Sequence, residues 1–576
     1  MLVYDFEVFK YNWLVIFKNL STKEYTIIID NKKELEEFYN NHSSDLYIGY
    51  NNKHYDDFIL KTILSGADPY LVSKLIIEDE KSQYNIMKAL KIKDLKINSF
   101  DLIQDIKGMS LKEVEGFMEM SIEESSIDFN LQRPLTQDEI NETIKYCKHD
   151  VDATEQFLTQ IRAPYLRSKL EIARLFHLPR NILNKTNADL VSMVLGAKRI
   201  SRDDELEYDL PKELVLNKPE YKNILKLYVG KEIDYKEKLT VDVAGVEHIF
   251  AWGGLHGAIP NFTYVGELWQ IDATSFYPTL MIEHNYMSRN LKDSSKFKEL
   301  VETRIKAKKE GNKGIADALK LLINSCYGAM KAPWNNLYDA KMANQVCITG
   351  QLFLTDLIEK IEPYSKLVQS NTDGILIIPY DKDKILEEIK KVEKRIRVNF
   401  EIDVFQGVWQ KDVNNYIILD GNGKVKSKGA YVSQYHRARE NNRGFRNSGR
   451  ILDDAVVDYF IKGVDPEETI NNCNDIFAFQ LICKTGGSYE NTYWPTKNGD
   501  VKVNKVNRVY ASKDQSYGHL YKLKINEDGS TRKDSIANLP DHCLVDNAAT
   551  CDISQIDKSW YIKTAKERIK SYKGEK

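Results

Sequence analysis

The sequence predicts an α/β and α+β protein of several domains, and three observations support this class. With 576 residues, the chain is longer than a single domain usually is. Residues 1–160 alternate strand-like and helical patterns, as an α/β domain does. Farther along, an apolar run at residues 269–280 and two β-rich segments at residues 366–370 and 375–380 alternate with helical patterns, which is typical of an α+β domain.

Composition limits the functional classes without selecting one. No apolar run approaches the roughly 20 residues of a membrane span, and the acidic, strand-like N-terminus does not resemble a signal peptide. The seven cysteines are scattered and show no zinc spacing, so we expect reduced thiols and a cytoplasmic protein without a membrane partner. The net charge of −3 does not favour nucleic-acid binding, but residues 424–450 carry eight basic side chains against one acid, which favours a surface that follows phosphates.

Two carboxylates in the second half lie where strands are expected to end. The run at residues 269–280 delivers Asp272, and a predicted hairpin turn presents Asp373. Such a pair suits two hard divalent cations. Between them, Lys320, Asn324 and Tyr327 share one face of a predicted helix. Carboxylates beside a helix that bears a cation and an aromatic ring suggest a site for a nucleoside triphosphate.

A second acidic set lies near the N-terminus. Asp5 and Glu7 project from the same face of a predicted strand, and Asp56 follows a segment with two asparagines. Tyr146 and Asp150 are four residues apart and share a helical face. A lone Asp-x-Glu pattern also fits a solvated strand end, and the whole set also fits a structural cluster of ion pairs. Four acids with a tyrosine favour a second metal site.

The two sets, in this order, resemble family-B DNA polymerases of the compact bacteriophage type. The first polymerase motif of that family, Asp-x-x-Ser-Leu-Tyr-Pro, matches residues 272–278 with Phe276 in place of Leu. The second, Lys-x-x-x-Asn-Ser-x-Tyr-Gly, matches residues 320–328 at every fixed position. The third, usually Asp-Thr-Asp, is Asn371-Thr372-Asp373 here. The N-terminal acids resemble the three exonuclease motifs of the same family.

The resemblance implies a ribonuclease H-like exonuclease domain followed by a palm, fingers and thumb polymerase domain. We expect a 3′–5′ exonuclease domain at 1–160, a helical connector at 161–235, a palm at 236–290 and 331–425, fingers at 291–330, and a thumb or C-terminal DNA-binding region at 426–576.

In the polymerase site, the resemblance implies that Asp272 and Asp373 hold two Mg²⁺ ions, with Mn²⁺ as a substitute. Tyr277 would exclude a ribose 2′-hydroxyl, Tyr327 would line the nascent base pair, and Gly328 would end its helix. The remaining residues expected to bind the dNTP are Arg304, Lys308, Lys320 and Asn324, together with the backbone near Ser275 and Phe276.

In the exonuclease site, the resemblance implies that Asp5, Glu7, Asp56 and Asp150 hold two further metal ions, and that Tyr146 orients the attacking water. Asn51 and Asn52 both fit the spacing to Asp56, so either could contact DNA. The other residues expected to contact DNA are Ser110, Leu111, Trp252, Gly253, Gly254, Tyr416 and Lys428.

Several positions depart from the family pattern. Asn371 replaces the first Asp of the third motif, and Ala251 replaces the tyrosine of a Tyr-x-Gly-Gly segment. Gln351 and Asn414 stand where an arginine and a lysine are expected, and Glu124 stands where the exonuclease domain should carry a lysine. These departures affect expected DNA contacts and leave the metal carboxylates intact.

We therefore expect a template-directed DNA polymerase that adds dNTPs to a primer 3′-hydroxyl by a two-metal mechanism and proofreads with a 3′–5′ exonuclease, in phage or mobile-element replication. Its partners would be primer–template DNA, a single-stranded 3′ end, dNTPs and replication accessory proteins. One alternative is a protein-primed polymerase of the same family. The other is an exonuclease or DNA-binding protein whose polymerase half is inactive, as Asn371 suggests.

Overall fold

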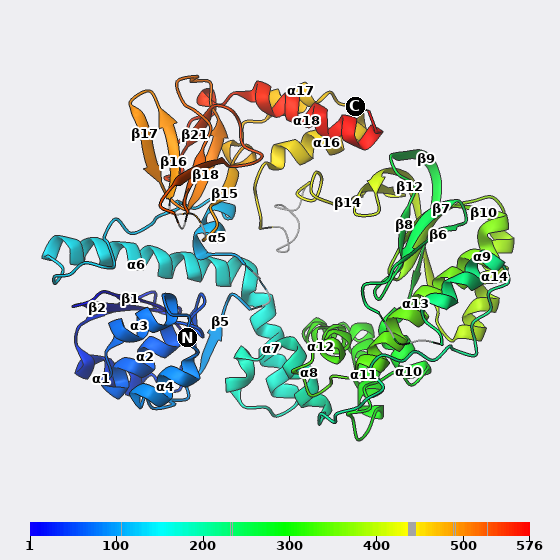
Figure 1. Cartoon of the computed structure of the whole chain (residues 1–576), viewed down its shortest axis with the longest axis horizontal. Helices are drawn as coiled ribbons and strands as arrows, with labels where there is room; N and C mark the ends of the chain where they lie inside the picture. The colour runs from blue at the N-terminus through cyan, green and yellow to red at the C-terminus, as the bar shows by residue number, and fades with distance from the viewer. Residues whose placement is uncertain are drawn as a thin grey trace. The chain divides into compact units, whose positions relative to one another are not determined.

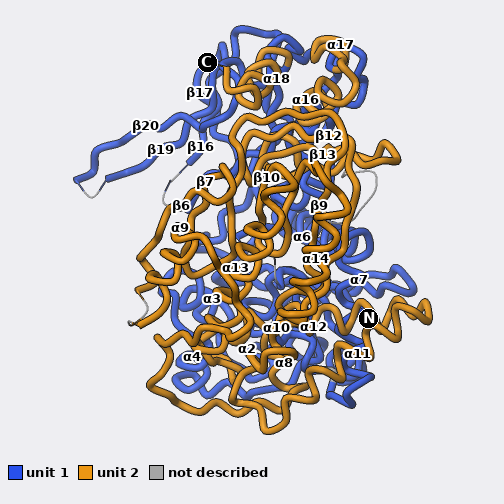
Figure 2. Tube along the Cα trace, turned by 90° about the vertical axis from the view of Figure 1, so that its right-hand side faces the viewer, with its two compact units in different colours: residues 1–186, 436–451, 470–561 blue, residues 187–435, 452–469, 562–576 orange. Residues whose placement is uncertain are grey.

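The chain folds into two compact units, which Figure 2 colours separately. The structure, a computed structural model, describes residues 1–104, 106, 108–230, 232, 234–435, 445–487, 489, 491–526 and 528–575. Unit 1 comprises Met1–Thr186, His436–Ile451 and Ile470–Tyr561, and unit 2 comprises Asn187–Tyr435, Leu452–Thr469 and Ile562–Lys576. Helices and several sheets occur in both units, which confirms the predicted mixed α/β multidomain class. Residues 426–576, expected as one region, are shared between the two units.

The N-terminal part of unit 1 is a five-stranded sheet, in the order β3-β2-β1-β4-β5, with helices on both faces (Figure 1). Alternate residues of β1 pack on opposite faces. Tyr4 and Phe6 join a core with Phe58 of α2, and Val3 joins another with Cys147 of α6. The strands are β1 (Leu2–Val8), β2 (Trp13–Asn19), β3 (Tyr25–Ile29), β4 (Tyr47–Gly49) and β5 (Ser99–Asp101). The helices are α1 (Lys32–Asn41), α2 (Asp56–Ser65), α3 (Pro69–Ile77), α4 (Gln83–Leu90), α5 (Leu111–Phe117), α6 (Gln137–Phe157), η1 (Leu158–Arg162), α7 (Ala163–Leu175) and η2 (Arg180–Asn184).

The C-terminal part of unit 1 is a β module built from a three-stranded and a four-stranded sheet, in the orders β15-β18-β21 and β17-β16-β19-β20. It packs on the segment around α5. The fully buried Arg508 donates to the carbonyl of Met120 at 2.6 Å, and Gln480 donates to the carbonyl of Gly116 at 3.0 Å. Its elements are η5 (Ile476–Ala478), β15 (Leu481–Lys484), β16 (Asn491–Thr496), β17 (Gly499–Val503), β18 (Val506–Ala511), β19 (Tyr521–Ile525), β20 (Thr531–Ser535), β21 (Cys543–Val545) and η6 (Ile553–Gln555).

Unit 2 is built on a nine-stranded sheet in the order β14-β13-β12-β9-β11-β10-β8-β7-β6. Asp272 lies near the end of β9, and the predicted hairpin is confirmed, because Asn371 of β10 pairs with Gly374 of β11 around a two-residue turn. The strands are β6 (Leu239–Val243), β7 (Val246–Phe250), β8 (His256–Ala258), β9 (Phe262–Ala273), β10 (Ser365–Asn371), β11 (Gly374–Pro379), β12 (Phe400–Asp412), β13 (Asn415–Asp420) and β14 (Val425–Lys428).

The helices of unit 2 include the two expected between the first and second polymerase motifs. They are α11 (Ser295–Lys309) and α12 (Lys313–Lys331), and Asn312 caps the second by accepting the amide of Ile315. The prediction that Gly328 ends this helix is wrong, because α12 continues to Lys331. The others are α8 (Asn187–Leu195), α9 (Pro219–Asn223), η3 (Ile224–Leu227), α10 (Phe276–Glu283), α13 (Ala340–Ile361), η4 (Glu362–Tyr364) and α14 (Lys382–Ile396).

Three helices follow in the C-terminal stretches: α16 (Arg450–Lys462), α17 (Pro466–Asn472) and α18 (Lys558–Lys573). Within unit 2, Val456 and Val457 of α16 and Ile569 of α18 share a core with Trp409 and Ile417 of the large sheet. This core attaches the last helices to the strands that precede β14.

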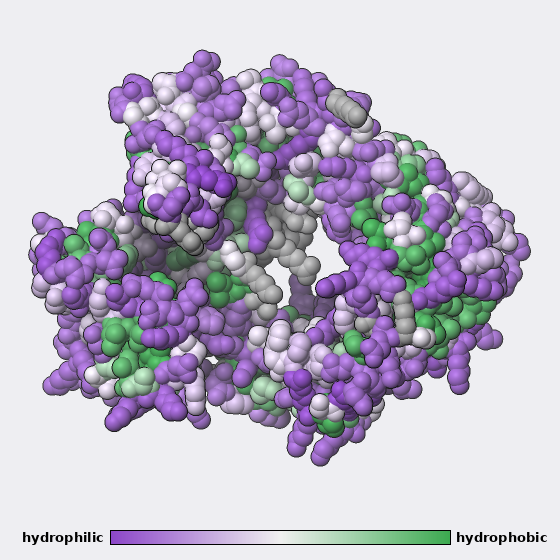
Figure 3. Space-filling view, viewed as in Figure 1, coloured by the Kyte–Doolittle hydropathy of each residue, from purple (hydrophilic) through white to green (hydrophobic). Residues whose placement is uncertain are grey.

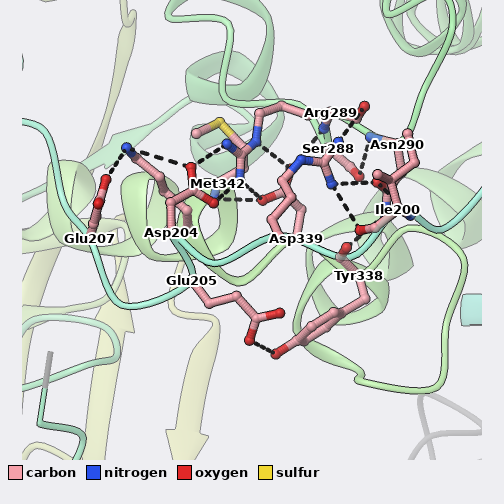
Figure 4. A network of polar contacts seen from close by, with 12 residues as sticks. Ile200, Asp204, Glu205, Glu207, Ser288, Arg289, Asn290, Tyr338, Asp339 and Met342 are labelled. Carbon is pink, nitrogen blue, oxygen red and sulfur yellow. Dashed lines mark hydrogen bonds and ion pairs between the residues drawn. The ribbon is translucent and has the colours of Figure 1, made fainter. Parts of the chain in front are cut away.

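Arg289 organises an ion-pair network that joins a loop of unit 2 to the N-terminus of α13 (Figure 4). Its guanidinium bonds to Asp339 at 2.8 Å and to Asp204 at 2.5 Å. Asp339, only 3% exposed, also caps α13 by accepting the amide of Met342. Removing the arginine would leave this buried carboxylate without its main counter-ion.

We expect Arg289→Leu to lower the free energy of unfolding by about 3–5 kcal/mol, the cost of breaking a buried ion pair on one side. Lys391→Met is the matched control, since Lys391 pairs with Glu387 on an exposed surface, and its loss should leave the free energy of unfolding nearly unchanged. Thermal and denaturant unfolding followed by tryptophan fluorescence measures both. Equal effects of the two substitutions would contradict a special role for Arg289.

Hydrophilic residues predominate on the face shown in Figure 3, while the apolar side chains are concentrated in the cores described above. Within the described residues, no helix has the length and apolar character needed to cross a lipid bilayer.

Candidate active sites

The four N-terminal carboxylates come together in unit 1. Asp5 and Glu7 take the odd positions of β1, so they face α6 rather than α2. Asp150 and Tyr146 lie on the facing side of α6, and Asp56 begins α2 and accepts the backbone amide of Phe6 at 3.0 Å. The predicted strand and helix positions of these residues are confirmed.

The carboxyl groups of this cluster have raised pKa values because they are buried close to one another. Glu7, Asp56 and Asp150 are 3–6% exposed. Burial and the charge of Asp150 raise the pKa of Asp5 to about 8, and burial raises the pKa of Asp150 to about 6. Burial also raises the pKa of Glu7 and Asp56 well above the ordinary carboxyl value. Acids that repel one another in this way form a strong site for divalent cations.

Ligand atoms of Asp5, Glu7 and Cys147 lie within 4.8 Å of one another. Burial raises the pKa of the Cys147 thiol, which donates to the backbone carbonyl of Asp5 at 3.5 Å, so it acts as a hydrogen-bond donor. The carboxylate oxygens that remain are the donors that Mg²⁺ and Mn²⁺ prefer. The donor set therefore fits hard divalent cations, although it does not specify which one.

Lys112 is a residue of this site that the sequence analysis did not select. Its ammonium lies 2.5 Å from an Asp150 oxygen, 3.0 Å from a Glu115 oxygen and 4.6 Å from the centre of the Tyr146 ring. Glu115 is fully buried. In the sequence, Lys112 and Glu115 are three apart and look like an ordinary surface pair on a helix. Only the packing of α5 against α6 brings them to the carboxylates.

The expected DNA contacts of unit 1 differ in accessibility. Asn52 is fully buried and donates to Asp57 at 3.3 Å, whereas Asn51 is exposed and has a left-handed backbone with φ of 62°. Ser110 is the N-cap of α5 and forms a reciprocal capping box with Glu113, which fixes where the helix begins. Leu111, half-buried, packs against the core beneath α6.

The second pair of carboxylates lies at one edge of the large sheet in unit 2, with Asp272 on β9 and Asp373 in the turn between β10 and the adjacent strand β11. Asp272 pairs in register with Gly374, and the amide of Ala273 donates to the carbonyl of Asp373 at 2.8 Å. Gln270 donates to the Asp272 carboxylate at 2.7 Å. Desolvation raises the pKa of Asp272, and the charge of Asp373 adds to the rise. A Cβ at Gly374 would lie 1.8 Å from an Asp272 oxygen, so only glycine leaves room for this carboxylate.

The turn that carries Asp373 is held from the neighbouring strand. Thr372 has a left-handed φ of 49°, and its amide donates to the carbonyl of Leu255 at 2.8 Å. Its hydroxyl lies 3.2 Å from a ring nitrogen of His256. A Cβ on Gly254 would meet that hydroxyl at 2.6 Å. Gly254 therefore permits the close packing that fixes the turn.

A cavity of about 250 Å³ adjoins Asp373 and gathers most of the expected dNTP-binding residues. Arg304 contributes a buried Nε without a hydrogen-bond partner, a donor available to an anion. The rings of Tyr277 and Tyr327 lie 4.7 Å apart in its wall. Lys308 and Lys320 are exposed on α11 and α12 and do not line it. The expected residues that line it are Ser275, Phe276, Tyr277, Arg304, Asn324 and Tyr327.

A second cavity, of about 450 Å³, shares Thr372 and Asp373 with the first and also contains Asp272. Tyr416 of β13 and Lys428 of β14 pair in register and line it, as does Asn371. Lys426 also lines this cavity. Asn414, which stands where the family pattern has a lysine, is exposed and does not line it. Desolvation raises the pKa of Asp373, and the positive charge of Lys428 reduces this rise.

One departure from the family pattern, Gln351, has a structural role beside Trp252. Gln351, where an arginine is expected, donates to the carbonyls of Ala251 at 2.8 Å and Gly253 at 2.7 Å. Trp252 is 8% exposed and donates to the carbonyl of Asp234, so its ring is largely covered. Gly253 stays partly exposed beside it. These bonds fix the loop that precedes β8.

Two acidic residues near Asp272 were also missed by the sequence analysis. Glu401 of β12 pairs in register with Asp272, and Asp403 follows two residues later on the same face. Both are exposed. The alternating pattern around these residues predicts a strand. The sequence does not show which strand it pairs with, because the pairing of β12 with β9 is a long-range contact.

Comparison with known proteins finds distant likenesses. No protein-family model matches the sequence. DNA polymerase 1 of Sulfolobus acidocaldarius is 29% identical over 119 residues, which make up 19% of this chain and 13% of that protein. The family B DNA polymerase from the hyperthermophilic archaeon Pyrobaculum calidifontis aligns with 99% of this chain and 77% of its own, with a TM-score of 0.42 and 14% identity. Both named proteins are DNA polymerases, and the aligned part spans about an eighth of the first.

Proposed function

We propose that this protein is a template-directed DNA polymerase of family B with a 3′–5′ proofreading exonuclease. The observation that carries the proposal is the position of Asp373, in the common wall of two cavities and in the turn that precedes the strand paired with Asp272. One cavity offers an arginine and two aromatic rings, which suit a nucleoside triphosphate. The other offers lysines and a tyrosine, which suit the end of a nucleic-acid strand. The partial sequence match to a DNA polymerase is consistent with this assignment.

In the polymerase reaction, the primer 3′-oxygen attacks the α-phosphorus of the dNTP, the bond to the bridging oxygen breaks, and pyrophosphate leaves. Two Mg²⁺ ions held by Asp272 and Asp373 would activate the hydroxyl and stabilise the leaving group. We assign the binding of the triphosphate to Arg304 and Asn324, which both line the smaller cavity. We assign Lys308 and Lys320 the same role, which would require the exposed faces of α11 and α12 to approach the nucleotide.

In the exonuclease reaction, water attacks the terminal phosphodiester, the bond to the 3′-oxygen breaks, and that oxygen takes up a proton. We assign the binding of the required cations to Asp5, Glu7, Asp56 and Asp150. Tyr146, on the same face of α6 as Asp150, would orient the water. Of the two asparagines, the exposed Asn51 is the one that we assign to the single strand.

We further propose that the enzyme extends an ordinary primer, without a terminal protein. The structure describes residues 234–435 continuously. Between Asp272 and Asn371 they form α10, α11, α12, α13, η4 and β10 with short connections. This arrangement leaves no separate subdomain to clamp a priming protein, and it also favours distributive synthesis.

A gel assay with a 5′-labelled primer on a template tests the proposal. With Mg²⁺ and one dNTP at a time, the primer should gain a nucleotide only when the dNTP complements the template base. Without dNTPs, it should shorten from its 3′ end. Shortening without any templated addition would instead favour the alternative of an inactive polymerase half, for which Asn371 is the motivation.

Tyr277 provides a test of sugar selection. Tyr277→Ala should raise the relative rate of ATP over dATP insertion by at least about tenfold, because the ring fills space that a 2′-hydroxyl would need. The substitution should also weaken dATP binding somewhat. Tyr277→Phe is the matched control, since it keeps the ring and should keep the discrimination. Unchanged discrimination in Tyr277→Ala would remove this residue from sugar selection.

A further inference from the structure

Lys112 occupies an unusual place for a lysine, between two carboxylates of different kinds. Asp150, at 2.5 Å, belongs to the proposed cation site, whereas Glu115, at 3.0 Å, lies on the same helix as Lys112. The lysine side chain is 13% exposed, and that of Glu115 is fully buried. A buried carboxylate needs a permanent counter-charge. Glu115, which also lies 3.6 Å from a ring nitrogen of His149, therefore gives Lys112 a second partner besides Asp150.

The helix that carries both residues is fixed at each end. At its start, the capping box of Ser110 and Glu113 sets the first turn. Gln480 of the β module donates to the carbonyl of Gly116 in the last turn of α5, and Arg508 donates to the carbonyl of Met120 just past the end of the helix. The backbone that carries Lys112 is therefore held by hydrogen bonds at both ends of α5.

We infer that Lys112 is a positioning residue of the proposed nuclease site. Its ammonium competes with divalent cations for Asp150. When a divalent cation is bound there, Glu115 keeps the ammonium beside the phosphate. This inference rests on the proposed exonuclease function. A divalent cation that binds the Asp150 oxygen now paired with Lys112 replaces that one of the two Lys112 bonds. The ammonium, still paired with Glu115 and next to Tyr146, is then available to a non-bridging oxygen of the scissile phosphodiester.

Charge supports the same assignment. Burial lowers the pKa of Lys112, but Asp150 and Glu115 outweigh it and raise the pKa above the ordinary lysine value, so the side chain stays charged. Lys112 therefore places a positive charge directly beside Asp150 and Glu115.

The test combines metal binding with catalysis. Mn²⁺ binding is measured by the electron paramagnetic resonance of free Mn²⁺, in an Asp272→Asn, Asp373→Asn background that silences the second site. Lys112→Met should bind Mn²⁺ about tenfold more tightly, because the ammonium no longer occupies an Asp150 oxygen and no longer repels the incoming cation. With all other residues native, the same substitution should slow primer shortening by about 10²-fold, the effect of losing a charged group at a reacting phosphate.

Three further variants keep the inference testable if Lys112→Met is unstable. Glu115→Gln should weaken Mn²⁺ binding and also slow shortening, because Lys112 then remains on Asp150. Lys112→Arg should restore both quantities towards the parent values. Lys145→Met, on an exposed position of α6, should change neither.

The opposite signs of the two Mn²⁺ effects distinguish competition from a purely structural role, which would weaken binding in both variants. Unchanged or weaker Mn²⁺ binding in Lys112→Met would overturn the inference, as would an unchanged rate of shortening. If the parent protein does not shorten primers, the proposed exonuclease function is wrong. Lys112 then has no phosphodiester to position, so the positioning role is wrong as well. The Mn²⁺ titration then still reports whether Lys112 competes at Asp150.

Discussion

Gly374→Ala is expected to slow nucleotide addition by about 10²–10³-fold, comparable to the loss of a group that stabilises the transition state directly. The reason is geometric. A methyl group at this position would lie 1.8 Å from an Asp272 oxygen and 2.8 Å from the Gln270 amide that holds the carboxylate. The strands on both sides fix the backbone, so the carboxylate itself has to move. Steady-state insertion of a single dNTP measures the effect as a loss of kcat.

The control for Gly374→Ala is Gly314→Ala, because a Cβ at Gly314 meets only an Asn312 oxygen at 3.8 Å. Gly314 lies in the first turn of α12, where alanine is favourable. Gly374→Ala should retain primer shortening, since the proposed exonuclease site lies in unit 1. A near-normal rate of addition would show that Asp272 does not work from the position described.

The second large effect is expected from the pair Asp5→Asn and Glu7→Gln. Together they should reduce primer shortening by at least about 10³-fold, because two of the four carboxylates lose the charge that holds cations. Nucleotide addition should stay within about twofold of the parent rate. The shapes of the side chains are kept, so packing between β1 and α6 should change little.

This pair also gives a stability readout that does not depend on catalysis. Burial and Asp150 raise the pKa of Asp5 to about 8, so folding disfavours its ionised form. Such a group costs stability as pH rises from about 4, its unfolded value, towards 8. In EDTA at pH 8, the variant should therefore be at least as stable as the parent in thermal unfolding. A clear loss of stability would mean that these acids form structural ion pairs instead of a cation site.

Local patterns in the sequence were sufficient to place most of the carboxylates. The two-residue spacing of Asp5 and Glu7 and the four-residue spacing of Tyr146 and Asp150 survive in β1 and α6, because strand and helix periodicity fix them. The hairpin at Asp373 also follows from local signals. The two helices expected between the first and second polymerase motifs are present as α11 and α12, and they carry Arg304 and Asn324 as expected.

Long-range packing determined what the sequence could not show. Lys112 joins the N-terminal carboxylate cluster only because α5 packs on α6, and Glu401 reaches Asp272 only through the pairing of β12 with β9. Asn52 looked as suitable as Asn51 until its burial against Asp57 was visible. Gly328 looked like a helix end, but the apolar stripe of α12 continues past it through Ala329 and Met330, both fully buried.

One experiment tests most directly the central claim that two separate carboxylate sites carry two opposing reactions. The parent protein, Asp373→Asn and the Asp5→Asn, Glu7→Gln pair are each incubated with a 5′-labelled primer–template and Mg²⁺, with and without dNTPs. We predict that Asp373→Asn still shortens the primer but does not extend it, and that the pair extends it but does not shorten it. Loss of both activities in either folded variant would contradict the assignment of two separate sites.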